Sequence, residues 1–358
     1  MKKFFALAAI AVLALASCSN NTLDPQSQKA REINFSAVAG KATRAPIEST
    51  YYPTDIPFGV FCYALTDGQT WAANSSSGQL YMDNETVSYN TTVDANGIYA
   101  TSTTYYWPLS GSLTFIGYSP KATTGTVAYD KANKRLTVTD FTVNSSAAAQ
   151  QDLMWSNTQA DCTDATTTDK GNYLSASDDT QSTYKGVNMV FNHALSQIKF
   201  NVKKAAGLEA YTLTVNSITF KAYNKGTLTV TNDSPAWSAQ AFLTGGDAFT
   251  FNTNGSNIEA PNNASDYAAF GVANMPVPQT LATGVQTFTI TYSLEKGGVN
   301  LGQKTVTDQD LLGATVTAWA ANTIYNYNIV IDLKKIYFNP TIEPWVTGSS
   351  QVINVPAN

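Results

Sequence analysis

The chain has 358 residues, enough for about two domains of ordinary size. Only 13% of the residues are charged, the formal net charge is −5, and no cluster of Lys and Arg occurs, which argues against nucleic-acid binding. Thr, Ser, Asn and Tyr are plentiful, a composition typical of β-strands joined by polar turns. We therefore expect an all-β protein of the extracellular type.

The N-terminal segment MKKFFALAAIAVLALASCSN predicts export. Its apolar run from Phe4 to Ala16 is shorter than the ~20 residues that span a bilayer, so it indicates a signal peptide. The run ends in Leu-Ala-Ser-Cys, which is similar to a bacterial lipobox. We interpret residues 1–18 as a lipoprotein signal peptide and Cys18 as the lipidated residue, anchored in the outer membrane by several acyl chains. The alternative is an ordinary secretory leader with an incidental cysteine.

The next segment, EINFSAV, predicts a short strand. Ile33, Phe35 and Ala37 alternate along it, so they share one face. The sequence AGKATRAP follows, and its small residues around Arg44 are typical of the accessible loops where proteolysis concentrates. One interpretation is a solvated linker, and the other is a cleavage site between Arg44 and Ala45.

Beyond this segment, helical periodicity is almost absent and short alternating runs recur between turn residues. Such runs favour β-sandwiches with Greek-key connections, and a closed barrel is the alternative. The clearest runs are residues 57–65, 112–119, 135–143, 197–203, 212–223, 226–231, 286–294 and 323–333.

A polar stretch rich in Ser, Thr, Asp and Ala covers residues 144–186. We place a domain boundary near its end. Two sandwiches are then expected, at residues 45–186 and 187–335, followed by a C-terminal extension of residues 336–358.

No catalytic constellation is evident in the sequence. His193 is the only histidine, which argues against a Ser-His-Asp triad or a multi-histidine zinc site and favours a hydrogen-bonded structural imidazole. Gly297 and Gly298 predict a hairpin turn rather than a phosphate-binding loop. We expect no enzymatic activity, no metal and no cofactor. A disulfide between Cys62 and Cys162 is left open, although Cys62 lies in a strand-like run where a buried thiol is commoner.

Aromatic residues suggest a second function. Trp71, Tyr105 and Trp107 would suit a monomeric surface lipoprotein that binds glycans through exposed rings. In a β-sandwich, however, such side chains more often fill the core.

Several stretches of the sequence, taken in order, span nearly the whole mature chain: the lipobox and residues 33–45, 58–64, 105–120, 152–156, 187–202, 225–231 and 322–345. Together they resemble the fimbrillin-like proteins of Bacteroidales, the major and minor subunits of lipoprotein-derived surface pili. The resemblance implies two tandem transthyretin-like Greek-key β-sandwich domains.

The resemblance also implies an assembly mechanism. The precursor reaches the outer membrane as a lipoprotein, an arginine-specific protease removes the N-terminal strand, and a strand from another subunit fills the vacated groove. In this chain the cut would fall between Arg44 and Ala45 and would release residues 19–44 as a pro-segment. The expected partners are other copies of the chain and related fimbrial subunits, in a fimbrium at the cell surface.

The C-terminal extension is the predicted donor strand, because it is long and apolar, although Pro340 and Pro344 interrupt pairing in its first part. Alternatively, the extension folds back as an edge strand of its own domain. Both states occur in turn if the extension pairs with its own domain before assembly and is donated to another subunit afterwards. A stalk subunit fits these features best, and a tip subunit is the alternative. The candidate donor residues are Ile336, Phe338, Ile342, Trp345, Val352, Ile353 and Val355.

Overall fold

The alternating runs of the sequence form β-strands in the computed structural model, which describes residues 32–39, 52–91, 98–163, 186–240, 249–262, 266–333 and 336–344. The helices among these residues are short: α1 (Trp71–Asn74) and the 3₁₀ turns η1 (Ser75–Ser77) and η2 (Ala147–Ala149). None of them is long and apolar enough to cross a membrane. The predicted all-β fold class is confirmed, whereas the division into two transthyretin-like domains stays a prediction.

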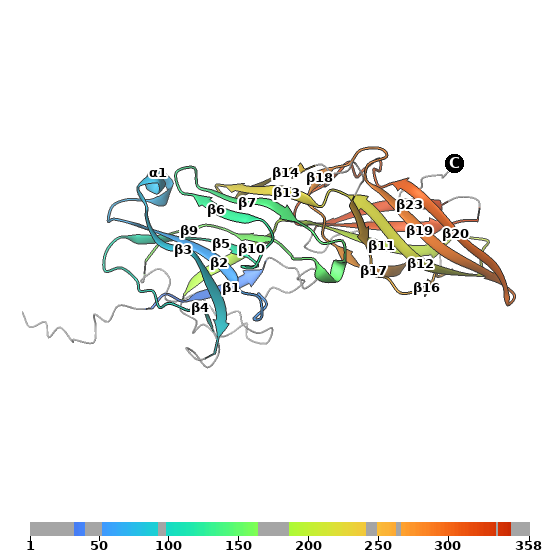
Figure 1. Ribbon diagram of the computed structural model, residues 1–358, viewed down its shortest axis with the longest axis horizontal. Coiled ribbons are helices and arrows are strands. Elements are labelled where there is room, and N and C mark those ends of the chain that lie inside the picture. The colour runs from blue at the N-terminus through green and yellow to red at the C-terminus, as the bar shows by residue number, and fades with distance from the viewer. Residues whose placement is uncertain are drawn as a thin grey trace, which may run out of the picture.

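One sheet of eight strands closes on itself at the left of Figure 1. Its order is β2-β3-β4-β1-β10-β8-β5-β9, and β5 also pairs with β2, so seven strands form a ring and β9 extends from β5. The structure thus contains one element of the barrel alternative. The strands are β1 (Phe35–Ala39), β2 (Phe58–Leu65), β3 (Gln79–Asn90), β4 (Ile98–Thr101), β5 (Ser112–Ser119), β8 (Met154–Ser156), β9 (Gln159–Cys162) and β10 (Val187–His193).

A second sheet combines strands from both sides of residue 186. Its order is β14-β13-β7-β6, so the β13–β14 hairpin pairs with a strand from the first half of the chain. β10, which begins at Val187, likewise belongs to the ring. The predicted domain boundaries are not tested by these pairings and stay a prediction. The strands are β6 (Thr126–Asp130), β7 (Arg135–Thr142), β13 (Lys225–Thr231) and β14 (Ser234–Gln240).

The remaining sheets form the right-hand part of Figure 1. They have the orders β17-β11-β22-β23 and β15-β12-β19-β20, with β16 paired to β12 and a small β18–β21 ribbon. The strands are β11 (Ser196–Lys204), β12 (Tyr211–Ala222), β15 (Phe249–Asn252), β16 (Ile258–Glu259), β17 (Ala268–Asn274), β18 (Gln279–Thr280), β19 (Thr287–Lys296), β20 (Val299–Asp310), β21 (Ala318–Trp319), β22 (Thr323–Ile331) and β23 (Ile336–Pro344).

The turn between β19 and β20 shows how local sequence sets this topology. Gly297 and Gly298 have φ angles of 57° and 78°. A two-residue hairpin turn with positive φ at both positions matches the twist of the strands it joins, and glycine adopts this conformation without steric cost. The predicted hairpin turn is therefore confirmed.

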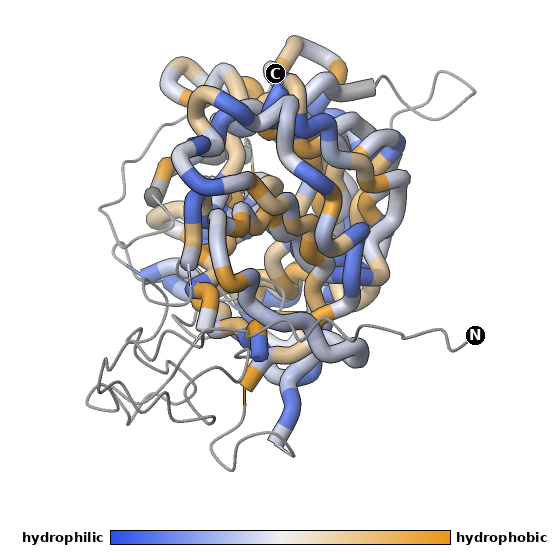
Figure 2. Tube along the Cα trace, turned by 90° about the vertical axis from the view of Figure 1, so that its left-hand side faces the viewer, coloured by the Kyte–Doolittle hydropathy of each residue, from blue (hydrophilic) through white to orange (hydrophobic). Residues whose placement is uncertain are grey.

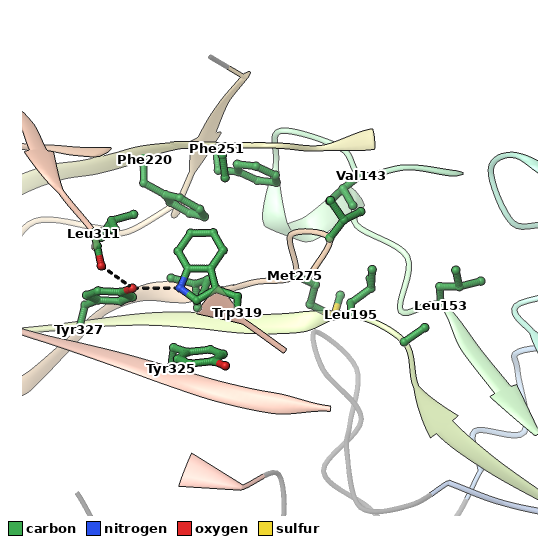
Figure 3. Close-up of a cluster of buried hydrophobic side chains, with 14 of the residues drawn as sticks. Val143, Leu153, Leu195, Phe220, Phe251, Met275, Leu311, Trp319, Tyr325 and Tyr327 are labelled. Carbon is green, nitrogen blue, oxygen red and sulfur yellow. Dashed lines mark hydrogen bonds between the residues drawn. The ribbon is translucent and has the colours of Figure 1, made fainter. Parts of the chain in front are cut away.

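The buried side chains form two clusters, and the tube in Figure 2 shows apolar segments gathered inside the polar ones. The larger cluster runs from the outer side of the ring into the right-hand sheets. Figure 3 shows part of it, from Leu153 through Leu195 to Trp319. There the Trp319 Nε1–H donates to the Tyr327 hydroxyl at 2.9 Å, and that hydroxyl donates to the Leu311 carbonyl at 3.0 Å. The smaller cluster fills the ring and contains β1.

Candidate functional site

β1 lies inside the ring, with a strand on each side. It pairs in parallel with β10 over five positions, from Phe35 opposite Val187 to Ala39 opposite Phe191. On its other side, Phe35 pairs with Tyr99 of β4 in the antiparallel sense. Because β1 separates β4 from β10, its removal would open the ring and leave backbone groups on both neighbours without partners. We call the space that β1 fills between these two strands the β1 slot.

The chain just before β1 is also bonded to the ring. The Ile33 N–H donates to the Tyr105 carbonyl at 2.8 Å, and the Val187 N–H donates to the Asn34 carbonyl at 2.8 Å. Glu32 forms an isolated antiparallel bridge with Tyr106. The slot therefore holds backbone from residue 32 to residue 39.

Three apolar side chains of this segment point into the smaller core cluster. Ile33, Phe35 and Ala37 are 2%, 0% and 3% exposed. The Phe35 ring lies edge-on to Phe58 and Phe115, with centroid distances of 6.1 Å and 5.6 Å. These are the residues that alternation in the sequence placed on one face. Their role as a removable strand remains a proposal.

One residue on the face of β1 opposite the core is buried as well. Ser36 is buried, and its hydroxyl donates to the Asn188 side-chain carbonyl at 3.3 Å. The burial of Ser36 is not evident from the sequence, since Ser is an ordinary residue of an exposed strand face. Both faces and both edges of β1 therefore contact other parts of the chain.

Two buried tyrosines stand beside the slot. The Tyr99 hydroxyl donates to the Tyr52 carbonyl at 2.8 Å, and the Tyr52 hydroxyl shares a 2.5 Å hydrogen bond with the Ser119 hydroxyl. Burial raises the pKa of both phenols far above its ordinary value, because the phenolate would lose its hydration there. Cys62 is buried in the same cluster, and burial raises the pKa of its thiol. Cys62 and Cys162 are not joined by a disulfide.

A buried histidine–aspartate contact lies at the far end of β10. His193 Nδ1 lies 2.9 Å from Asp152 Oδ2, and the His193 side chain is fully buried. The contact connects the end of β10 to the segment before β8, so it stabilises one wall of the slot. His193 thus has the hydrogen-bonded environment that the sequence favoured.

At the Glu32 end of the slot, Glu32 bridges Tyr106, and Leu109 follows Tyr106 three residues later in the chain. Leu109 is 87% exposed, and Tyr81 and Tyr106 are also exposed, with the Tyr81 hydroxyl donating to the Tyr106 carbonyl at 2.7 Å. We call Tyr81, Tyr106 and Leu109 the slot mouth. A cluster of apolar groups at a surface is a common mark of protein–protein contact.

The aromatic residues proposed for glycan binding are arranged differently. Trp71 and Trp107 are buried, each in one of the core clusters. Tyr105 is partly buried, and its hydroxyl donates to Glu85 Oε1 at 2.9 Å. These three residues therefore do not form the exposed platform of the glycan-binding hypothesis.

The start of the C-terminal extension is paired within its own chain. β23 lies at the edge of its sheet and pairs with β22 at nine positions, from Ile331 opposite Ile336 to Thr323 opposite Pro344. Ile342 is 44% exposed. Residues 336–344, with the candidate donors Ile336, Phe338 and Ile342, therefore adopt the edge-strand alternative. The remaining sequence-predicted sites lie outside the described residues: Cys18, Arg44, Ala45, Trp345, Val352, Ile353 and Val355.

Comparisons with known proteins add the following. The model of a family described as fimbrillin-like matches residues 43–345. A crystal structure of a candidate cell adhesion protein from Bacteroides uniformis is 15% identical, with 88% of this chain and 98% of that chain covered and a TM-score of 0.46. One from Bacteroides ovatus is 11% identical, with 90% and 100% covered and a TM-score of 0.47. No curated protein matches.

Proposed function

Because the chain belongs to the fimbrillin-like family, we propose that it is a stalk subunit of a surface fimbrium and polymerises by strand exchange. The family itself supports a fimbrial, cell-surface and non-enzymatic role. The finer points are our proposal: export as a lipoprotein through Cys18, cleavage between Arg44 and Ala45, and replacement of β1 by a strand of another subunit. The observation that carries the proposal is the burial of β1 between two strands of a closed ring.

The position of the cut relative to β1 gives the proposal its logic. β1 ends at Ala39, five residues before Arg44, and every other strand of the described residues follows the cut. Cleavage at Arg44 would therefore leave β1 in the slot without a covalent link to the rest of the fold. Once the link is gone, release of the pro-segment is favoured by dilution, whereas in the uncut chain β1 always stays close to the slot.

The vacated slot would bind a new strand strongly. Burying an Ile or Phe side chain contributes about 1.5–3 kcal/mol each, so losing Ile33 and Phe35 would expose a costly apolar surface. The edges of β4 and β10 would also offer unpaired N–H and C=O groups, which is the situation that favours strand addition. A strand from another copy relieves both costs at once.

An arginine-specific endoprotease tests the proposal, because the chain contains only three arginines: Arg31, Arg44 and Arg135. Arg135 is protected in β7, which pairs with strands on both sides. Residues 19–358, treated briefly with the protease, should be cut after Arg44, lose β1 and form oligomers in light scattering and fibres in electron microscopy. If the cut protein releases β1 and stays monomeric at high concentration, the proposal is wrong.

Two variants serve as matched controls. Arg44→Ala should remain monomeric, since a cut at Arg31 shortens the pro-segment but leaves β1 covalently attached. Arg31→Ala should polymerise like the unchanged protein. On cells that make the fimbrium, sheared fibres should contain chains that begin at Ala45; chains that begin at acylated Cys18 would indicate an anchor subunit or an ordinary lipoprotein.

A further inference from the structure

A cluster of polar side chains lies in the part of the ring farthest from β1. Starting at β1, the ring runs through β4 and β3 on one side and through β10 and β8 on the other, and it closes where β2 pairs with β5. β2 lies between β3 and β5, and its Gly59 is opposite Thr86 of β3 and Tyr118 of β5. The cluster is built across these three strands.

Gly59 allows the Tyr118 ring to cross β2. A Cβ atom at residue 59 would lie 2.2 Å from Tyr118 Cε1, closer than van der Waals contact allows, so the ring occupies the space of the missing side chain. The Tyr118 hydroxyl thereby reaches β3 and donates to Asn84 Oδ1 at 2.7 Å. A larger residue than glycine at position 59 would displace the ring from Asn84.

Asn84 itself lies in a β-bulge. Val60 of β2 is opposite Glu85 and Cys62 is opposite Met82, so two residues of β3 face a single residue of β2 at this point. Asn84 has a φ angle of 52°, in the left-handed region that Asn enters more readily than most residues. Bulges redirect side chains and are frequent beside functional sites. Here the bulge turns Asn84 toward Tyr118.

Lys121 brings an amine to the same carbonyl group. Its Nζ donates to Asn84 Oδ1 at 2.8 Å and to the Asn84 backbone carbonyl, and it lies 5.8 Å from the centroid of the Tyr118 ring. The Lys121 backbone N–H donates to the Pro57 carbonyl at 2.8 Å, which holds the residue against the start of β2. Because Asn84 Cγ is one bond from Oδ1, the amine lies within about 4 Å of this carbon.

From this arrangement we infer that the chain forms a covalent cross-link of its own, an amide bond between Lys121 Nζ and Asn84 Cγ. Such a side-chain amide is an isopeptide bond. It joins β3 to the segment after β5, across β2, and its formation releases one molecule of ammonia.

The reaction is an exchange of one amine for another and consumes only the two side chains. The Lys121 ammonium group loses a proton to solvent, since this side chain is only partly buried. The Nζ lone pair then forms a bond with Asn84 Cγ, while the electron pair of the C=O π bond moves onto Oδ1. When the C=O bond re-forms, the Cγ–Nδ2 bond breaks. Nζ gives up a second proton, Nδ2 gains one, and Nδ2 leaves as ammonia.

Three features of the site favour this reaction. The Tyr118 O–H donates to the oxygen on which negative charge develops, as the donors of an oxyanion hole do. Burial lowers the pKa of Lys121, and the charges of Glu85 and Asp83 oppose this only in part, so the neutral amine is more available than in an exposed lysine. Both reacting groups are also positioned by the fold, which makes the attack intramolecular.

The bond strengthens the ring on the side opposite the β1 slot. β2 lies beneath a covalent link, so β2, β3 and β5 cannot separate by losing hydrogen bonds alone. Both linked residues follow Arg44, so a chain cut there keeps the bond. A cross-link that closes the chain between residues 84 and 121 also restricts the unfolded state, which is the main way in which cross-links stabilise a fold.

The mass of the denatured protein tests the bond directly. Residues 19–358 should be lighter than their sequence mass by one ammonia molecule, and a proteolytic digest should contain the Asn84 peptide joined to the Lys121 peptide. A chain of full sequence mass would overturn the inference. Loss of ammonia without the joined peptides would overturn it as well, because the ammonia would then come from another residue.

Two conservative lysine variants locate the reacting amine. Lys121→Arg keeps the positive charge but lacks the nucleophilic amine, so it should have the full sequence mass. Lys131→Arg is the matched control, because Lys131 Nζ also donates to a backbone carbonyl, that of Gly78, and lies 6.0 Å from the centroid of the Tyr63 ring. The control should lose ammonia like the unchanged protein. A joined, lighter chain in Lys121→Arg would exclude Lys121 as the nucleophile.

The contribution of the hydroxyl group has its own test. Tyr118→Phe keeps a ring over Gly59 but removes the donor to Asn84 Oδ1. The linked fraction of this variant, followed by mass from the time of synthesis, should rise about tenfold more slowly or less than in the unchanged protein. An equal rate would show that the Tyr118 hydroxyl does not stabilise the developing charge.

Discussion

Replacing Phe35 by Ala tests the β1 slot most directly, because residue 35 stabilises the uncut chain but is absent from the cut protein. Phe35 is fully buried and lies edge-on to Phe58 and Phe115. Removing such a ring typically lowers the free energy of unfolding by about 3–5 kcal/mol, through lost burial and the cavity left behind. We expect this loss in the uncut Phe35→Ala variant, measured by urea unfolding of residues 19–358.

The same variant should become normal after cleavage. Once the protease has removed β1, Phe35→Ala and the unchanged protein are the same molecule, so their fibres should form at equal rates. Phe58→Ala is the matched control, because Phe58 lies in the same cluster but remains after the cut. It should weaken both forms. Equal stability of the uncut Phe35→Ala variant and the unchanged protein would refute the reasoning that Phe35 is part of the core.

Three further predictions concern other parts of the site. Because burial raises the pKa of Tyr52 and Tyr99, both keep their protons when folded while unfolded tyrosine ionises near pH 10. Stability should therefore fall above pH 10, by up to about 1.4 kcal/mol per pH unit for each, and Tyr52→Phe should reduce this slope in urea unfolding between pH 8 and 11. Leu109→Ser changes a side chain that is 87% exposed, so it should alter the free energy of unfolding by less than about 0.5 kcal/mol. It should nevertheless slow fibre growth, because we expect the slot mouth to contact the next subunit. Unchanged fibre growth would show that the slot mouth is not part of the contact between subunits. His193→Ala leaves the Asp152 carboxyl group without its ring partner and should cost about 1–3 kcal/mol in thermal or urea unfolding, whereas no loss would mean that the contact does not hold β10 in place.

The strand pattern was largely predictable because it is a local property of the chain. The runs at residues 112–119 and 323–333 became β5 and β22 with little change in their bounds. The alternation of Ile33, Phe35 and Ala37 likewise identified the buried face of β1, since side chains on a strand point alternately to opposite sides. None of these conclusions required knowing what each strand pairs with.

The pairings themselves were not predictable in this way. β1 meets β10 about 150 residues later in the chain, and the β13–β14 hairpin joins β7 across the predicted domain boundary. Such contacts depend on how the sheets pack as a whole, because nearly any two alternating strands can form the same backbone hydrogen bonds. The closed ring and the burial of Ser36 on the second face of β1 follow from that packing.

The sequence by itself therefore determined that the chain is all-β, that it resembles the fimbrillin-like family, and which side chains of the first strand face inward. Only the tertiary structure decided that this strand lies between two others in a closed ring, that Trp71 and Trp107 are core residues, and that residues 336–344 pair with β22. The physical reason is one of range: alternation and turn chemistry act between neighbouring residues, whereas burial and strand pairing depend on segments that meet only after the whole chain has folded.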